Sequence, residues 1–211
     1  QAAAARGLTR FVGRAAEVAQ LYRALASTAQ GRGQVVGVVG EPGVGKSRLF
    51  YELTSSRMRD GWLVLHASAA SYGKTTAYRP VVDLLRVYFG VDGGNEQRDV
   101  EEVVRARLVA LDPSLVSSLP ALLGLLQPGA ASPEWEALDR GRRRQQTLDA
   151  LRRLVLRESE AQPTCLVLED LHWIDSETHA FLDSLINTMP GARLLLLLNY
   201  RPEFQHGWSS K

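Results

Sequence analysis

The segment "QVVGVVGEPGVGKSRLF", residues 34–50, constrains the fold more than any other part of the chain. A short apolar run leads into a glycine-rich loop, and a stretch with helical spacing follows. Gly40, four intervening residues, and then Gly45, Lys46 and Ser47 fit the pattern of a phosphate-binding P-loop. The order strand, glycine loop, helix predicts a parallel α/β sheet with an anion site at the end of the first strand.

Glycine and charge give this loop the properties of a phosphate cradle. Gly43 and Gly45 allow backbone torsions and a close approach that a side chain would block, so successive N–H groups can converge on phosphate oxygens. We expect Lys46 to reach the β- and γ-phosphates of ATP or ADP, and Ser47 to offer its hydroxyl to Mg²⁺. The expected cofactor contacts in the loop are Gly40, Glu41, Pro42, Gly43, Val44, Gly45, Lys46, Ser47 and Arg48.

Three further apolar runs, "GWLVLHASA", "TCLVLED" and "ARLLLLLNY", are bounded by polar or turn residues and predict three more strands. Strands that alternate with helical segments predict an α/β fold in which helices sandwich a parallel sheet. Between the second and third strands, the apolar spacing over residues 71–162 predicts four helices, part of which form a helical insertion at about 71–135. Residues 1–9 are expected to be a linker, and residues 10–211 one domain excised from a longer polypeptide.

The overall composition narrows the range of partners. The chain has 25 basic and 23 acidic residues, so no net field draws it to nucleic acid or to a membrane. The only cysteine, Cys165, lies in an apolar run and is expected to be a buried spectator thiol in a reducing compartment. With no apolar stretch of the roughly 20 residues that span a bilayer, we expect a soluble, cytoplasmic protein. We interpret the arginines from Arg140 to Arg157 as a solvated helix face or a subunit contact.

Two acids follow the third predicted strand, at the edge of a parallel sheet where ligands bind. Glu169 and Asp170 can hold Mg²⁺ and can orient or deprotonate an attacking water. By position Glu169 should face Mg²⁺ and Asp170 the water, but the assignment stays open because the first acid at such a site is usually Asp. The alternative is a strand that simply ends in solvated charge.

The segment "HWIDSETHAF" permits two other interpretations, which we reject. His172, Asp175 and His179 could be drawn as a zinc site, and Ser176 with His172 and Asp175 as a hydrolytic triad. Asp175 is better explained as the N-cap of the following helix, and His179 lacks a third ligand at metal spacing. His172 remains a candidate for orienting the acidic pair.

The fourth predicted strand ends in Asn199, with Arg201 two residues further on. If the P-loop strand is its neighbour, both side chains lie beside the γ-phosphate, where an amide and a guanidinium could detect whether that phosphate is present. The alternative is an ordinary surface turn at "NYRPEF".

Four motifs, "FVGRAAEVAQL", "GEPGVGKSRL", "LVLEDLHWID" and "LLLLLNYRPEF", occur in this order over about residues 10–207. Together they resemble the nucleotide-binding domain of bacterial AAA+-like ATPases of the STAND class, as found after the catalytic domain of some adenylate/guanylate cyclases and in large LuxR-type regulators. The resemblance implies a P-loop NTPase fold of the AAA+/ASCE type, with the P-loop strand beside the "LLLLLNY" strand.

The resemblance also assigns residues and marks two departures. It implies that Val12, Gly13 and Arg14 lie near the adenine, that Glu169 and Asp170 form the Walker B pair, and that Arg201 is the first sensor. Glu169 stands where Asp is usual, which affects Mg²⁺ ligation and the hydrolysis rate. The chain is also expected to stop before the last strand of the family fold and before its helical lid.

These observations favour an ATP-binding regulatory switch with slow Mg²⁺-dependent hydrolysis. Two alternatives stay open: a nucleotide-binding scaffold without turnover, and a small-molecule kinase, since kinases share the P-loop. The expected partners are ATP and neighbouring domains of the same polypeptide, with cyclase, winged-helix and TPR domains as candidates. A homo-oligomer is a further candidate, and no direct contact with nucleic acid or membrane is expected.

Overall fold

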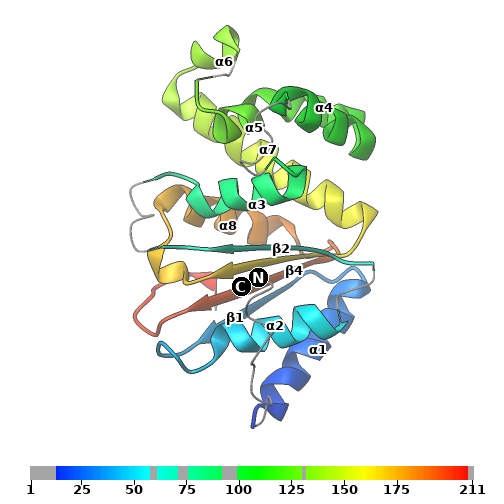
Figure 1. The fold of residues 1–211 in the computed structure, drawn as a ribbon, viewed down its shortest axis with the longest axis vertical. Coiled ribbons are helices and arrows are strands. Elements are labelled where there is room, and N and C mark those ends of the chain that lie inside the picture. Colours follow the sequence, from blue (N-terminus) through cyan, green and yellow to red (C-terminus); the bar gives the residue numbers. More distant parts are fainter. Residues whose placement is uncertain (1–12, 58–60, 71–75, 92–98, 130–131, 209–211) are drawn as a thin grey trace.

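A computed structural model describes residues 13–57, 61–70, 76–91, 99–129 and 132–208. Its centre is a parallel sheet of strands β1 (Gln34–Val39), β2 (Leu63–Ser68), β3 (Thr164–Glu169) and β4 (Leu194–Tyr200), in the order β1-β4-β3-β2 (Figure 1). The P-loop strand β1 pairs with β4, with Val38 opposite Asn199. The α/β class and this strand neighbourhood are both confirmed.

Helices cover the two faces of the sheet (Figure 1). One face carries α1 (Ala15–Ala29) and α2 (Lys46–Arg57), and the other carries α3 (Arg79–Phe89), α7 (Arg140–Ala161) and α8 (Ser176–Thr188). Further from the sheet lie α4 (Val100–Leu111), α5 (Leu119–Leu126), the short α6 (Pro133–Glu136) and a 3₁₀ turn, Pro113–Ser118. In the described residues the four helices expected before β3 are α3, α4, α5 and α7. A further short helix, α6, was not expected in this stretch, and the Ser132 side chain caps it by accepting the Trp135 amide.

The leucine run of β4 explains why this strand is central. Every residue of β3 and β4 is buried, as a strand covered on both faces requires. Leu195 and Leu197 join the core under α1 and α2, whereas Leu196 and Leu198 join the core under the opposite helices. Cys165 of β3 is also fully buried, and burial raises the pKa of its thiol, which agrees with the predicted spectator role.

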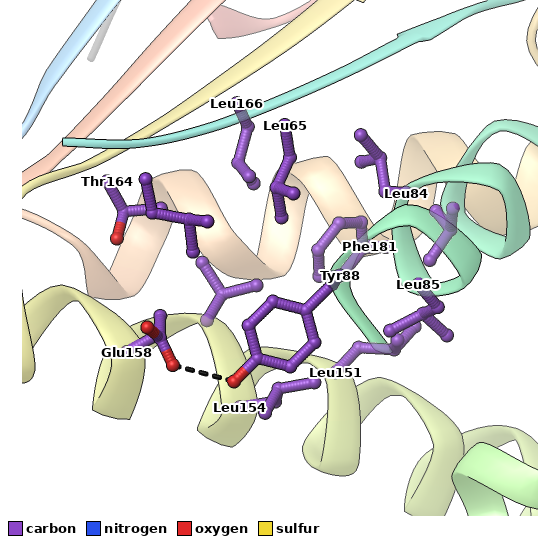
Figure 2. A pocket seen from close by; sticks show the side chains of 13 residues that line it. Leu65, Leu84, Leu85, Tyr88, Leu151, Leu154, Glu158, Thr164, Leu166 and Phe181 are labelled. Carbon is purple, nitrogen blue, oxygen red and sulfur yellow. Dashed lines mark hydrogen bonds between the residues drawn. The ribbon is translucent and has the colours of Figure 1, made fainter. Parts of the chain in front are cut away.

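A small apolar cavity of about 30 Å³ lies between the sheet and helices α3 and α7 (Figure 2). Its lining is mostly leucine, but Glu158 lies at one end, where it is only 3% exposed. The Tyr88 hydroxyl donates a hydrogen bond of 2.6 Å to this carboxylate, and Gln162 donates a second. The Arg107 guanidinium lies 3.6 Å from the same carboxylate. Glu158 is therefore a buried acid whose partners come from three helical segments.

Two acids at the start of α8 fasten three helices together. The Asp175 carboxylate accepts the amides of Glu177 and Thr178, which confirms its predicted role as an N-cap. The same carboxylate accepts the amide of Tyr78 at 3.0 Å, where the chain has a left-handed backbone at the start of α3. Glu177 accepts hydrogen bonds from the Tyr78 hydroxyl and from Arg144 of α7. The helical layer is thus joined to the segment that follows β3.

Most arginines of α7 are engaged in local ion pairs. Arg152 pairs with Asp149 on its own helix, and Arg157 pairs with Asp112 at 2.8 Å. Arg144 reaches Glu177 on α8. Within the described parts of the chain, no helix combines the length and the apolar character needed to cross a bilayer.

Candidate functional site

The glycine loop between β1 and α2 has the backbone geometry that its sequence predicts. Gly43 and Gly45 have φ angles of +80° and +89°, in the left-handed region that favours glycine. α2 starts at Lys46, and the Leu49 amide donates to the Gly45 carbonyl, so the first turn of the helix opens directly from the loop. The helix N-terminus therefore points at the space that the loop encloses.

The Lys46 side chain folds back over this loop. Its ammonium donates to the carbonyls of Gly40 at 2.8 Å and Glu41 at 3.0 Å, and the residue is only 8% exposed. A lone buried ammonium is costly, and the two carbonyls compensate for part of its lost hydration. Lys46 is thus held at the centre of the cradle, where an anion could replace the carbonyls as its partner.

The start of α1 is attached to the same loop. The Arg14 guanidinium donates to the Val44 carbonyl, and a Cβ built on Gly45 would lie 4.0 Å from that guanidinium. Gly13, with φ +83°, turns the chain into Arg14. Both residues were expected near the adenine, and their position against the loop leaves that role a prediction. Val12 lies outside the described residues.

Glu169, at the end of β3, is the most highly connected side chain of the site. It is 6% exposed and accepts hydrogen bonds from three elements: Ser47 Oγ of α2, Asn199 Nδ2 of β4 at 2.7 Å, and His66 Nε2 of β2 at 2.7 Å. Burial alone raises the pKa of this carboxyl, but the hydrogen bonds outweigh it, so the pKa lies below its ordinary value. Glu169 is therefore a carboxylate at neutral pH, in contact with the hydroxyl expected to bind Mg²⁺.

Asp170 is oriented by its main chain. Its φ and ψ angles of 58° and 44° are left-handed, a conformation that Asp tolerates better than most residues. Its amide donates to Asn199 Oδ1 at 2.7 Å, while Asn199 Nδ2 donates to Glu169. One amide side chain, only 1% exposed, therefore fixes both acids relative to the strand that neighbours the P-loop strand.

Arg201 and His172 lie beyond the two strand ends. The Arg201 guanidinium is 6.0 Å from the centre of the Trp173 ring and 3.9 Å from Glu203. Neither ring nitrogen of His172 has a hydrogen-bond partner among the described residues, although both are shielded from solvent. Burial lowers the pKa of His172, and the Arg201 charge lowers it further. A sensor role for Arg201 stays a prediction, and His172 makes no hydrogen bond to the acidic pair it was expected to orient.

His66 is the residue that the sequence did not reveal. It lies on β2, 103 residues before Glu169, and the two meet only because β2 pairs with β3, with Ser68 opposite Glu169. The available signal was a single imidazole in the apolar run "LVLHAS". Without the strand order, this signal cannot be distinguished from a residue on the exposed face of an edge strand.

The residues of the rejected zinc site and hydrolytic triad make specific local contacts instead. His179 Nδ1 pairs with Asp183 one turn later on α8, at 3.1 Å. Asp175 is engaged by backbone amides, as the N-cap interpretation predicts.

A groove of about 760 Å³ runs from Ser47 and Glu169 along α2 and the edge strand β2. Its described lining is mostly apolar and hydroxyl-bearing, and the guanidinium in it, Arg48, pairs with Glu52. A second anionic substrate would therefore find little free positive charge along this lining.

The residues present fit a Mg²⁺-nucleotide. The loop amides and Lys46 match phosphate oxygens, and the Ser47 hydroxyl and the two carboxyl groups are the hard oxygen ligands that Mg²⁺ prefers.

Comparison with known families supports the same conclusion. A family model described as an AAA ATPase domain matches residues 10–198, and a search of curated proteins finds no match. The matched range includes the glycine loop, the acidic end of β3 and β4 as far as Leu198, so Asn199 lies just beyond it. Membership of this family implies nucleotide binding, typically with Mg²⁺. From its four-stranded parallel sheet, its P-loop geometry and this match, we conclude that the chain belongs to the AAA ATPase domain family.

Proposed function

We propose that this chain is an ATP-binding regulatory module that hydrolyses ATP slowly with Mg²⁺ and acts as a nucleotide switch in a multidomain signalling protein. The observation that carries the proposal is the chain of hydrogen bonds from Ser47 through Glu169 to Asn199 and the Asp170 amide. It links α2, β3 and β4 at the mouth of the glycine loop, where a terminal phosphate would lie.

Each side chain of the network has a separate role. Lys46 and the loop amides bind the phosphates, while Ser47 and Glu169 hold the metal. Mg²⁺ supplies positive charge that offsets the charge of the phosphate oxygens when it is bound. Asp170 orients the attacking water or accepts its proton, and Asn199 keeps Asp170 and Glu169 in register. Gly13 and Arg14, with Val12, are proposed to contact the adenine.

Both weak nucleotide binding and slow turnover are supported by the hydrogen bonds that the residues of the site make with one another. The Lys46 ammonium is already bound by two carbonyls, and Ser47 is already bound to Glu169. A nucleotide must exchange these bonds for its own, which lowers its net affinity. Glu169 is also one methylene longer than the usual Asp and contacts Ser47 directly, so the metal must share or displace that contact. A long-lived triphosphate state is what a switch requires.

The wider context belongs to the same proposal. The resemblance to STAND-class modules supports a bacterial cytoplasmic protein of the cyclase or transcription-regulator type. In such a protein, Arg201 would report the terminal phosphate to neighbouring domains, and a homo-oligomer is one way in which the signal could be read.

The test is calorimetry with ATP and ADP in the presence of Mg²⁺, followed by phosphate release over an hour. We expect binding in the wild type and none in Lys46→Met, which keeps the length of the side chain but removes its charge. Phosphate release should be slow and should disappear in Asp170→Asn. Asp149→Asn, which alters a partly exposed acid on α7, is the matched control and should behave as the wild type. Unchanged ATP affinity in Lys46→Met would refute the proposal.

A nucleotide-binding scaffold without turnover is the second candidate. It is favoured by the direct Ser47–Glu169 contact, which occupies both groups expected to bind the metal. Under this alternative ATP binds but Mg²⁺ does not change its affinity, and phosphate release in the wild type equals that in Asp170→Asn. The calorimetry, repeated with and without Mg²⁺, therefore separates the two candidates.

A further inference from the structure

His172 has a ring whose polar atoms are left unsatisfied. Within the part of the chain that the structure describes, neither Nδ1 nor Nε2 has a hydrogen-bond partner, and neither reaches solvent. Buried polar groups are nearly always hydrogen-bonded, because burial removes their hydrogen bonds to water and this loss costs free energy unless a new partner replaces the water. Such an exception needs an explanation. One explanation is that the group gains its hydrogen-bond partner only when a ligand binds.

The position of this ring suggests which ligand. His172 lies in the 3₁₀ turn Leu171–Trp173, directly after Asp170 at the carboxyl end of β3. Its ring packs against Trp173, with 5.1 Å between the ring centroids, and the Arg201 guanidinium lies 6.0 Å from the same tryptophan ring. The charges of Arg201, Asp170, Glu203 and Lys46 act on the imidazole, in decreasing order of effect. The ring therefore lies next to Asp170 and against Trp173, at the edge of the sheet where the terminal phosphate is proposed to bind.

We propose that His172 is the residue by which this chain distinguishes a nucleoside triphosphate from a diphosphate, through a hydrogen bond from a ring N–H to the terminal phosphate group. This inference rests on the proposed function, because it requires the nucleotide to bind in the glycine loop. An imidazole in either neutral tautomer carries one N–H donor, so the ring needs no change of charge to make this bond.

The ring can reach a ligand by a local rotation. His172 as a whole is partly exposed although its nitrogens are shielded, so its solvent-facing surface does not include them. The torsion between Cβ and the imidazole is broad and roughly two-fold, and a half-turn about it exchanges the positions of ring nitrogens and carbons. The unpaired nitrogens can thus turn toward the open side without movement of the backbone.

A purely structural role predicts a different response to substitution. If the ring only fills space, a phenyl ring of similar shape serves as well and removes two unsatisfied polar atoms. His172→Phe should then be at least as stable as the wild type and should bind ATP and ADP as the wild type does. Under the proposal, the same variant keeps its stability but loses its preference for the triphosphate.

The experiment is calorimetry with Mg²⁺, using the β,γ-imido analogue of ATP and using ADP. In His172→Phe we expect the affinity for the analogue to fall about tenfold, as for one lost hydrogen bond to a charged group, and that for ADP to stay unchanged. His172→Gln, which retains an N–H donor, should recover part of the loss. His179→Phe makes the same replacement at a histidine paired with Asp183 on α8, and it should keep the wild-type preference.

A measurement on the wild type supports or refutes the proposal without any variant. The ring ¹⁵N resonances of His172 should shift between the ADP-bound and analogue-bound states, while those of His179 should not. Equal losses of affinity for both nucleotides in His172→Phe, no loss for either, or unshifted His172 resonances would each overturn the inference. If the wild type binds neither nucleotide, the proposed function itself fails. That result is distinct from normal binding with an unchanged preference in His172→Phe.

Discussion

The substitution Asn199→Asp tests the acidic network with almost no change in shape. It replaces the amide that donates to Glu169 Oε2 at 2.7 Å by a carboxyl oxygen, and it keeps the oxygen that accepts the Asp170 amide. Two ionised carboxylates at that separation would repel by about 6 kcal/mol at an effective dielectric constant of 20. Protonating one of them at pH 7, from an ordinary pKa near 4, costs only about 4 kcal/mol. The pair should therefore take up a proton.

The pH dependence of the free energy of unfolding should then have the opposite sign in Asn199→Asp. In the wild type the folded-state pKa of Glu169 is depressed, so its stabilising contribution is present at neutral pH and is lost as the pH falls through the acid range. In Asn199→Asp the folded protein holds one more proton than the unfolded chain. Its stability relative to the wild type should fall by about 1.4 kcal/mol for each pH unit above about 4. We expect a loss of about 1 kcal/mol at pH 5 and about 4 kcal/mol at pH 7.

Urea denaturation followed by circular dichroism at pH 5, 6, 7 and 8 measures this slope. Asn199→Ala is the control, because it removes both hydrogen bonds without adding a titrating group and should give a loss that depends far less on pH. It also accounts for His66, whose ring contacts Glu169 and is present in both variants. Parallel stability curves for Asn199→Asp and Asn199→Ala would refute the assignment of Asn199 as the neighbour of an ionised Glu169.

Three further predictions concern stability and the loop. Tyr88→Phe leaves the buried Glu158 without its 2.6 Å donor and should lower the free energy of unfolding by about 1–3 kcal/mol, measured by urea denaturation, whereas a change under 0.5 kcal/mol would show that the other donors compensate. Asp175→Ala removes the N-cap of α8 and should lower the same free energy by about 1–2 kcal/mol, with loss of helical circular dichroism, and Asp175→Asn should restore part of it. Gly45→Ala places a Cβ at φ +89° and should abolish nucleotide binding in calorimetry, while Gly191→Ala, where a Cβ meets no atom within 4 Å, should not.

The sequence alone was sufficient to predict those parts of the site whose residues lie close together in the chain. The loop from Gly40 to Ser47 carries its own geometry, because glycine spacing and a helix start determine it within a few residues. The N-cap at Asp175 is equally local. Predicting that Asn199 lies beside β1 also required the order of the strands in the sheet. The resemblance implied that order, and the pairing of β1 with β4 confirms it.

Contacts between distant strands could not be predicted in this way. His66 reaches Glu169 only through the pairing of β2 with β3, and neither its spacing nor its neighbours in the sequence indicate the partner. For His172, closeness in sequence was misleading. Its position near Glu169 and Asp170 in the chain suggested a hydrogen bond to them, but the left-handed backbone at Asp170 turns the chain away from the strand direction. A single residue with unusual torsions is enough to separate neighbours in the chain.

The junction at Asp175 and Glu177 has a mechanical consequence. These two carboxylates bind the start of α3 and the side of α7, and they lie only a few residues after Asp170. Force applied to the helical layer, for example by a protein that docks on α3, would therefore reach the acids through the hydrogen bonds to Asp175 and Glu177 and the short segment that joins these residues to Asp170. Force on α1 would instead pass into the sheet, because α1 packs against β1 and β4. The helical layer, although distant in sequence from the phosphate cradle, is thus linked to the carboxylates opposite that cradle through one short segment of chain.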